Sequence, residues 1–195
     1  DERNLVLLRL ATAGKQHGSV TSAQTDLAAL RAIPGVESAS AINTLPLSSS
    51  QWSLAYSLRP MRAFSDGVQV PVFFGGPELL QTLGIRVIQG DAFRPSDYSD
   101  LSPKDVFKTF VNARQALITK AFAQRLWPHA SAVGKVMYMG ETRVLVVGVV
   151  SNIIKPYISA DAHRPDKLLR DHLAVSRGSG LECVVCPALP ACRVC

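Results

Sequence analysis

The sequence predicts an α+β domain in which βαβ-type units form a mixed sheet with helices on one face, plus an inserted β-rich lobe. Three observations support this prediction. Short apolar runs of strand length alternate with segments of helical period through the first 150 residues. Proline and glycine punctuate the boundaries between these segments. A serine-rich stretch with alternating apolar residues interrupts the series and supplies the additional lobe.

The first unit reads as strand, helix, strand. The apolar run Asn4–Leu10 fits a buried strand. Alanine, leucine and isoleucine then recur at helical spacing over Ala23–Ile33. Pro34 and Gly35 end this helix, since proline and glycine are the usual helix-stopping residues. Alternation over Val36–Ile42 predicts a half-buried strand.

The β-rich lobe is expected within about residues 44–75. Four apolar residues occupy alternate positions and predict one strand, and Val68–Phe74 predicts a second. Pro71 favours an edge position for that second strand, because proline cannot donate a ladder hydrogen bond. The alternating residues are Trp52, Leu54, Tyr56 and Leu58. Their shared face is either core or a partner-facing surface for which Trp52 and Tyr56 are the candidates.

The second unit follows at once. Pro77 stands at the favoured first-turn position of a short helix that runs to Leu83, and Gly84 ends it. Ile85–Ile88 returns as a strand. The polar stretch between residues 90 and 108 is expected to be an exposed loop.

The last unit reads as strand, helix and hairpin. Ala116–Ile118 is a short strand, and Lys120–Trp127 is a helix that Pro128 ends. Lys135–Met139 and Arg143–Val150 form a hairpin around a Gly-Glu turn.

Composition excludes several classes of function. Apolar residues make up 47% of the 195 residues, which is enough for a folded core. The net charge is +6, but the basic residues are scattered and not interleaved with aromatics, so no nucleic-acid surface is predicted. No stretch approaches the roughly 18–20 apolar residues that span a bilayer. Because the chain lacks an initiator Met and a signal peptide, we expect a fragment of a longer protein.

Several segments, in this order and spacing, resemble the MacB-like periplasmic core domain of bacterial ABC-transporter permeases. Each is a turn or an element end, and together they extend over roughly residues 3–155. They are Ile33–Ser40 with Asn43, Leu45 and Pro46; Gly76–Ile85; Gly90–Phe93 with Asp97; Ala121–Pro128; Val133–Lys135; and Val146–Asn152.

The resemblance implies a non-enzymatic domain on the periplasmic side of the bacterial inner membrane. It implies as partners the membrane-embedded remainder of the permease and a cytoplasmic ATPase, with a periplasmic adaptor or an exported substrate on the other side. The implied role is a relay of conformational change during export. No cofactor is implied, and the isolated domain is expected to be a monomer or a weak dimer. A stand-alone periplasmic binding or sensing module is the alternative.

The sequence departs from the family pattern at two places. Asp91 stands where the family usually has Arg after Gly90, so no charge-specific contact is carried over. After about Lys155 the resemblance ends. We therefore expect a core domain over residues 1–160 and a poorly ordered tail, without recognisable strands, over residues 161–195.

The tail holds all four cysteines as two C-x-x-C pairs. Four thiolates can bind a tetrahedral zinc. The gap of five residues between the pairs is much shorter than the usual spacing of about 12–20. A zinc-binding protein therefore stays an alternative, disulfides are a second one, and a tail outside any fold is favoured. The metal candidates are Cys183, Cys186, Cys192 and Cys195.

No arrangement of residues predicts catalysis. The four histidines have no metal or dyad spacing, and the serines at 48–50 lack a nucleophile elbow. The residues singled out are structural, because turns and close packing there require small or rigid residues. They are Pro34, Gly35, Gly84, Gly90, Pro128, Gly134 and Gly148.

Overall fold

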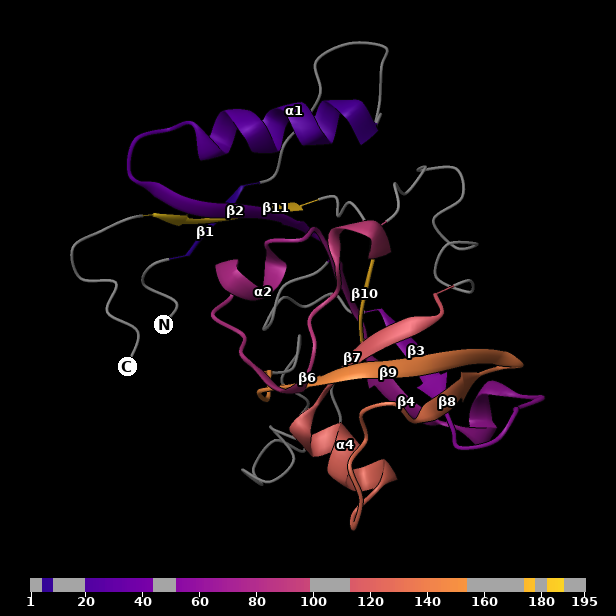
Figure 1. The fold of residues 1–195 in the computed structure, drawn as a ribbon. Coiled ribbons are helices and arrows are strands. Elements are labelled where there is room, and N and C mark those ends of the chain that lie inside the picture. Colours follow the sequence, from indigo (N-terminus) through magenta and orange to yellow (C-terminus); the bar gives the residue numbers. More distant parts are fainter. Residues whose placement is uncertain are drawn as a thin grey trace, which may run out of the picture.

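The computed structural model describes residues 5–8, 20–43, 52–98, 113–153, 174–177 and 182–187. Within these ranges, nine strands form one mixed sheet (Figure 1). They are β1 (Val6–Leu8), β2 (Val36–Ile42), β5 (Phe73–Gly75), β6 (Val87–Gly90), β7 (Gln115–Thr119), β8 (Val136–Met139), β9 (Thr142–Val150), β10 (Ala174–Arg177) and β11 (Glu182–Pro187). The predicted α+β class with a mixed sheet is confirmed.

The strands follow the order β1-β11-β2-β5-β10-β7-β9-β6, and β8 pairs with β9 beside this path. The pairs β10–β5 and β7–β9 are parallel, and the other pairs are antiparallel. A separate two-stranded sheet joins β3 (Ser53–Tyr56) to β4 (Val68–Pro71). This second sheet is the predicted β-rich lobe.

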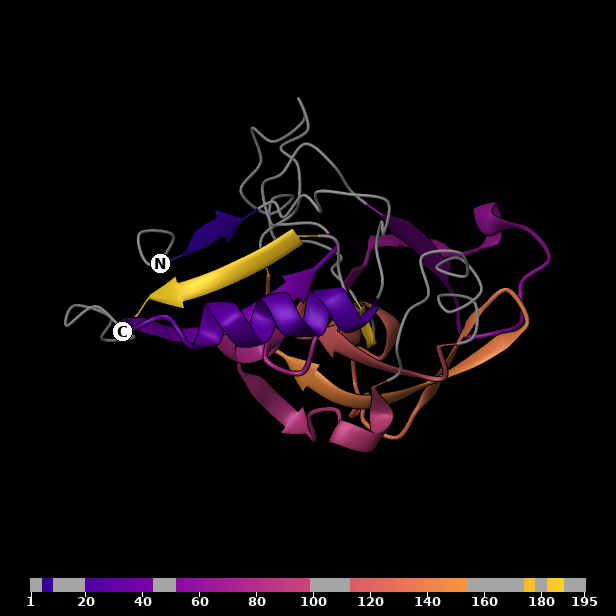
Figure 2. The same ribbon diagram turned by 90° about the horizontal axis from the view of Figure 1, so that it is seen from above.

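Helices lie on both sides of β2. The helices are α1 (Val20–Arg31), α2 (Leu79–Thr82) and α4 (Lys120–Leu126), with 3-10 turns at Phe64–Asp66 and Pro95–Asp97. α1 lies above β2 and β11, and α2 lies below β2 (Figure 1). Seen from above, α1 runs alongside β11 (Figure 2). Leu27 of α1 packs with Ala39 and Ala41 of β2, while Ile42 and Leu79 belong to the larger core on the other side.

Strand β2 matches its predicted bounds, but it is not half-buried. Its side chains from Ser38 to Ile42 are all buried. The expectation of one exposed face was wrong because α1 covers one face and the main core covers the other. Serine and alanine are small enough to fit under a helix on both faces, so the alternation of serine and alanine does not distinguish an exposed face from a buried one.

The apolar run predicted as a single strand over Val68–Phe74 is two strands in different sheets. β4 ends at Pro71, and β5 begins at Phe73. Asn43 holds the crossing: its side-chain Oδ1 accepts from the Phe74 N–H at 2.7 Å, and its Nδ2 donates to the Val72 carbonyl at 3.2 Å. The apolar character of the run continues across the break, because Val70, Val72 and Phe73 are all buried.

The β-rich lobe is attached to the predicted hairpin. Ser57, just after β3, exchanges two main-chain hydrogen bonds with Tyr138 of β8, at 3.0 and 2.8 Å. The ring of Tyr56 meets the ring of Phe122 edge to face, with centroids 6.4 Å apart. The lobe therefore shares a core with α4 and the main sheet instead of forming an independent unit.

Helix α4 begins and ends close to its predicted positions. Thr119 caps it, since its Oγ1 accepts from the Phe122 N–H at 3.3 Å. The N–H of Trp127 donates to Ala123 at 2.8 Å, and Pro128 follows. The helix connects β7 to the hairpin that carries β9, so the parallel β7–β9 pair is formed over a helical crossover.

Residues beyond 160 differ from the sequence expectation. β10 pairs with β5 and β7, and β11 pairs with β1 and β2. The expected boundary at residue 160 thus falls between β9 and two strands of the same sheet. Both strands are short and gain their partners from distant segments, which explains why no local pattern indicated them.

Candidate functional site

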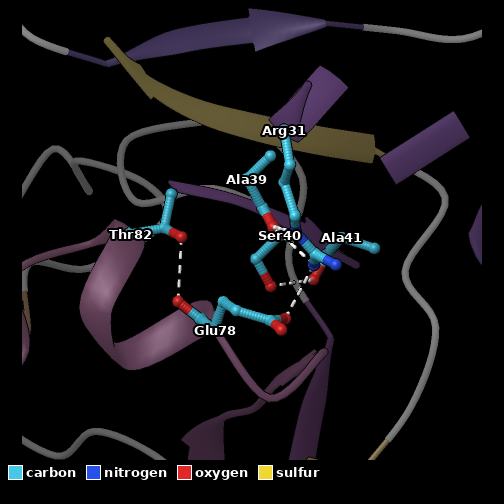
Figure 3. Close-up of polar contacts among 6 residues, drawn as sticks. All are labelled: Arg31, Ala39, Ser40, Ala41, Glu78 and Thr82. Atoms are coloured by element: carbon cyan, nitrogen blue, oxygen red, sulfur yellow. Dashed lines mark hydrogen bonds and ion pairs between the residues drawn. The ribbon is translucent and has the colours of Figure 1, made fainter. Parts of the chain in front are cut away.

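A group of polar contacts joins α1, β2 and the residue before α2 (Figure 3). The guanidinium of Arg31, in the last turn of α1, donates to the Ala39 carbonyl of β2 from Nε at 3.0 Å and from Nη2 at 2.8 Å. The same Nη2 donates to Glu78 Oε2, before α2, at 2.8 Å. We call these three residues the Arg31 clasp.

The clasp is a reversible contact. The side chains of Arg31 and Glu78 are 36% and 34% exposed. Ion pairs with that access to water contribute about 0.2–1 kcal/mol, because solvent screens the charges and holding two long side chains costs entropy. The ion pair therefore adds little to stability, while the two hydrogen bonds from Arg31 to the Ala39 carbonyl hold the end of α1 on β2.

Beneath the clasp, the end of β5 packs closely against both α2 and β2. A Cβ at Gly75 would lie 2.5 Å from Leu79 Cδ2 and 2.7 Å from the Ala41 carbonyl oxygen. The nearby Thr82 hydroxyl, which is buried, donates to the Glu78 carbonyl at 2.8 Å. Sequence reasoning took Gly75 and Gly76 only as a turn. Their adjacency was the available signal of close backbone approach.

Two of the predicted structural glycines lie opposite each other. Gly90 of β6 pairs with Gly148 of β9. A Cβ at Gly148 would lie 2.6 Å from the Asp91 carbonyl oxygen and 2.9 Å from Leu117 Cδ2. Main-chain atoms cannot move aside as a flexible side chain can, so this strand crossing requires glycine.

The other predicted structural residues stand at turns. Gly35, Gly84 and Gly134 have φ of 89°, 65° and 80°, and Gly140 in the hairpin turn, which was not singled out, has 61°. Pro34 lies in the exposed turn between α1 and β2. Pro128 is exposed just after α4.

The alternating residues of the β-rich lobe, which were predicted to share one face, lie partly on the surface and partly in the core. Trp52 is 42% exposed and Leu58 is 47% exposed, whereas Tyr56 is 3% exposed. Tyr56 is covered by α4, while the two exposed residues lie beyond the ends of β3. Of the two candidates for a partner surface, only Trp52 is accessible in this structure.

Burial raises the pKa of the Tyr56 hydroxyl far above its ordinary value, because the charged phenolate would lose its hydration.

The structure describes only two of the four cysteines that were candidates for a zinc site. Cys183 and Cys186 lie on β11, and Cys192 and Cys195 lie beyond the described ranges. Among the residues that the structure describes, no group of three or more His, Cys, Asp or Glu side chains could hold a metal ion. No helix in the same ranges is long and apolar enough to cross a membrane.

Comparison with known proteins gives one family. The model of the MacB-like periplasmic core domain matches residues 2–174. No curated protein matches the chain.

Solved structures give distant likenesses. The periplasmic region of MacB from Actinobacillus actinomycetemcomitans is 13% identical with a TM-score of 0.47, over 86% of this chain and 65% of that one, so the chain spans just under two thirds of that region. The extracellular domain of the noncanonic ABC-type transporter YknZ from Gram-positive bacteria is 16% identical with a TM-score of 0.47, over 96% and 85%. A domain of a putative permease from Porphyromonas gingivalis is 16% identical with a TM-score of 0.44, over 88% and 62%.

Proposed function

Since the chain belongs to the family of MacB-like periplasmic core domains, which are extracytoplasmic parts of ABC-transporter permeases, we propose that it relays conformational change during export. On one side the partners are the membrane-embedded remainder of the permease and a cytoplasmic ATPase. On the other side they are the exported substrate or a periplasmic adaptor. The domain acts on the periplasmic side of the bacterial inner membrane and carries out no catalysis.

The pairing of β1 with β11 is the observation that supports this proposal. Val6 pairs with Val185 in an antiparallel register, so two segments that are far apart in the sequence lie in adjacent strands of one sheet. A force applied at these strands is carried across the hydrogen-bonded sheet to β9, β6 and the β-rich lobe.

The path from β1 and β11 to β9, β6 and the β-rich lobe combines stiff contacts with one weak contact. The glycine-tight contacts of β6 with β9 and of β5 with β2 are stiff, because main-chain atoms lie close together there. The Arg31 clasp is soft, since its charges are partly solvated. We expect the main sheet to move as one body and α1 to change its position relative to α2.

Distance measurements in the complete transporter test the relay. In a cysteine-free permease reconstituted with its ATPase, a spin label is placed at Ala29, on the exposed side of α1, or at Glu141, in the hairpin turn. We propose that the complete permease works as a dimer, and we expect the distance between the labels of its two protomers to change on ATP binding at both positions. A control with an ATPase that cannot bind ATP should show no change.

The outcome that overturns the relay is specific. If export and ATP hydrolysis proceed while both distances stay constant, the domain does not transmit the conformational change. If only the label at Glu141 moves, the β8–β9 hairpin of the main sheet moves while α1 stays in place, and the expected movement of α1 is wrong.

A further inference from the structure

A cavity of about 470 Å³ lies apart from the Arg31 clasp, between α4, the loop after it and the strands β6 and β9. Its volume is in the range of about 300–1,000 Å³ that is usual for small-molecule sites. Ala123 and Val149, which line it, are only 9% and 2% exposed. The cavity therefore has a buried apolar floor formed by a helix and a strand.

The polar residues at the cavity are all neutral or basic. Lys120, Gln124 and His129 line it from α4 and the following loop, and Gln89 lines it from β6; all four are exposed. None of these side chains forms a hydrogen bond or an ion pair with another residue in the described ranges. No Asp or Glu is among the lining residues. Within the described ranges, the Lys120 ammonium and the two glutamine amides are thus available to donate to an anion.

Two larger apolar side chains complete the wall. Ile88 sits at the irregularity in the β6–β9 register and is 44% exposed at the cavity. Such bulges re-aim a side chain and are frequent beside functional sites. Trp127 is fixed by the end of α4, and Lys135 Nζ lies 5.8 Å from the centroid of its ring. Lys135 adds a second positive charge near the same wall.

We propose that this cavity binds a carboxylate that is carried on a short apolar group. The ammonium of Lys120 provides the charge for the carboxylate, since hydrogen bonds to an ionised acceptor are about twice as strong as neutral ones. The side chains of Ile88 and Trp127 take the apolar group. Such a ligand is the C-terminus of a peptide that ends in an apolar residue, or a free carboxylic acid of similar size. The site does not depend on the proposed relay.

Nuclear magnetic resonance titration of the 195-residue chain tests the site directly. The probes are N-acetyl-leucine, its amide N-acetyl-leucinamide, and 4-methylpentanoate. The chain has two tryptophans, and their indole N–H signals are resolved from the backbone signals. We expect N-acetyl-leucine to shift the Trp127 indole signal with a Kd of about 1 mM, the affinity typical of so few atoms. The exposed Trp52 provides an internal control, and its signal should stay in place.

Variants identify the residues that bind. Lys120→Gln should weaken binding of N-acetyl-leucine about tenfold, because a charge-assisted hydrogen bond is lost. Arg143→Gln removes an equal charge from an exposed position that does not line the cavity, and should leave the Kd unchanged. An unchanged backbone spectrum shows that both variants are folded.

The three probes separate the possible results. Binding of N-acetyl-leucine but not of its amide supports the carboxylate site. Binding of both acids leaves a peptide C-terminus and a free acid as sources, whereas binding of 4-methylpentanoate alone assigns the free acid. Equal binding of acid and amide, or no shift of the Trp127 signal up to the solubility limit of every probe, overturns the proposal. If the distance measurements contradict the relay but the carboxylate still binds, the proposed site stands.

Discussion

Replacing Tyr56 by phenylalanine tests how the β-rich lobe is held on the main sheet. The Tyr56 ring is 3% exposed and packs edge to face against Phe122. Its hydroxyl has no hydrogen-bond partner among the described residues. A buried hydroxyl without a partner costs roughly 1–3 kcal/mol of folding free energy. Tyr56→Phe keeps the ring and removes this cost, so we expect a free energy of unfolding about 1 kcal/mol higher at neutral pH.

The pH dependence gives a second and larger signal. Burial raises the pKa of Tyr56 in the folded chain, whereas the unfolded chain ionises near its ordinary value of about 10. The unfolded state therefore loses the proton first, and the folded state loses stability as the pH rises above about 10. One such group changes the free energy of unfolding by about 1.4 kcal/mol per pH unit. The advantage of Tyr56→Phe over the parent chain should thus be about 1.4 kcal/mol larger at pH 11 than at pH 9.

Urea unfolding, followed by circular dichroism at several pH values, provides the measurement. Taking the difference between variant and parent cancels the titration of groups that both chains share. Tyr138→Phe is the control, because it removes a phenol that is only partly buried. A Tyr56→Phe variant that is less stable than the parent at neutral pH, or whose advantage does not increase above pH 10, would refute the buried and unpartnered hydroxyl.

Three other changes test the packing described above. Gly148→Val should lower the free energy of unfolding by about 3 kcal/mol, because the new Cβ meets a main-chain oxygen. Gly35→Ala has free space around its Cβ and should lower it by only about 1–2 kcal/mol, through the positive φ at that position. Equal losses of the two variants in thermal unfolding would contradict this distinction. A double-mutant cycle of Arg31→Ala and Glu78→Ala should give a coupling below about 1 kcal/mol that decreases with salt, and a larger, salt-independent coupling would show that the clasp is not a soft contact. Deleting residues 161–195 removes β10 and β11 and should lower the melting temperature. A truncated chain with the same melting temperature as the parent would show that the two strands add nothing to stability. If the parent binds one zinc, measured by mass spectrometry, and the truncated chain does not, the hypothesis of a zinc site at the cysteines is supported again.

Sequence patterns were sufficient where the signal is local. The bounds of β2 and the end of α4 follow from proline and glycine next to a periodic segment. The hairpin of β8 and β9 follows from two apolar runs around a Gly-Glu turn. In each case the residues that fix the element are within a few positions of it.

Sequence patterns did not predict the features that depend on residues far apart in the chain. The Arg31–Glu78 contact joins residues 47 positions apart, and no local pattern pairs them. The break at Val72 is set by Asn43, which is 29 positions away. The cavity beside α4 depends on a register irregularity at Ile88, and periodicity alone cannot place a bulge.

The place of β11 in the sheet has a consequence for biosynthesis. β11 lies between β1 and β2, so two strands from the start of the chain remain separated by a gap until residues 182–187 have been made. At translation rates of about 5–20 residues per second, the 140 positions between Ile42 and Glu182 take about 7–30 s. For that time the β11-facing main-chain groups of β2 stay unpaired, far longer than a hairpin needs to close. The nascent chain is thus exposed to strand-pairing errors until β11 has been made.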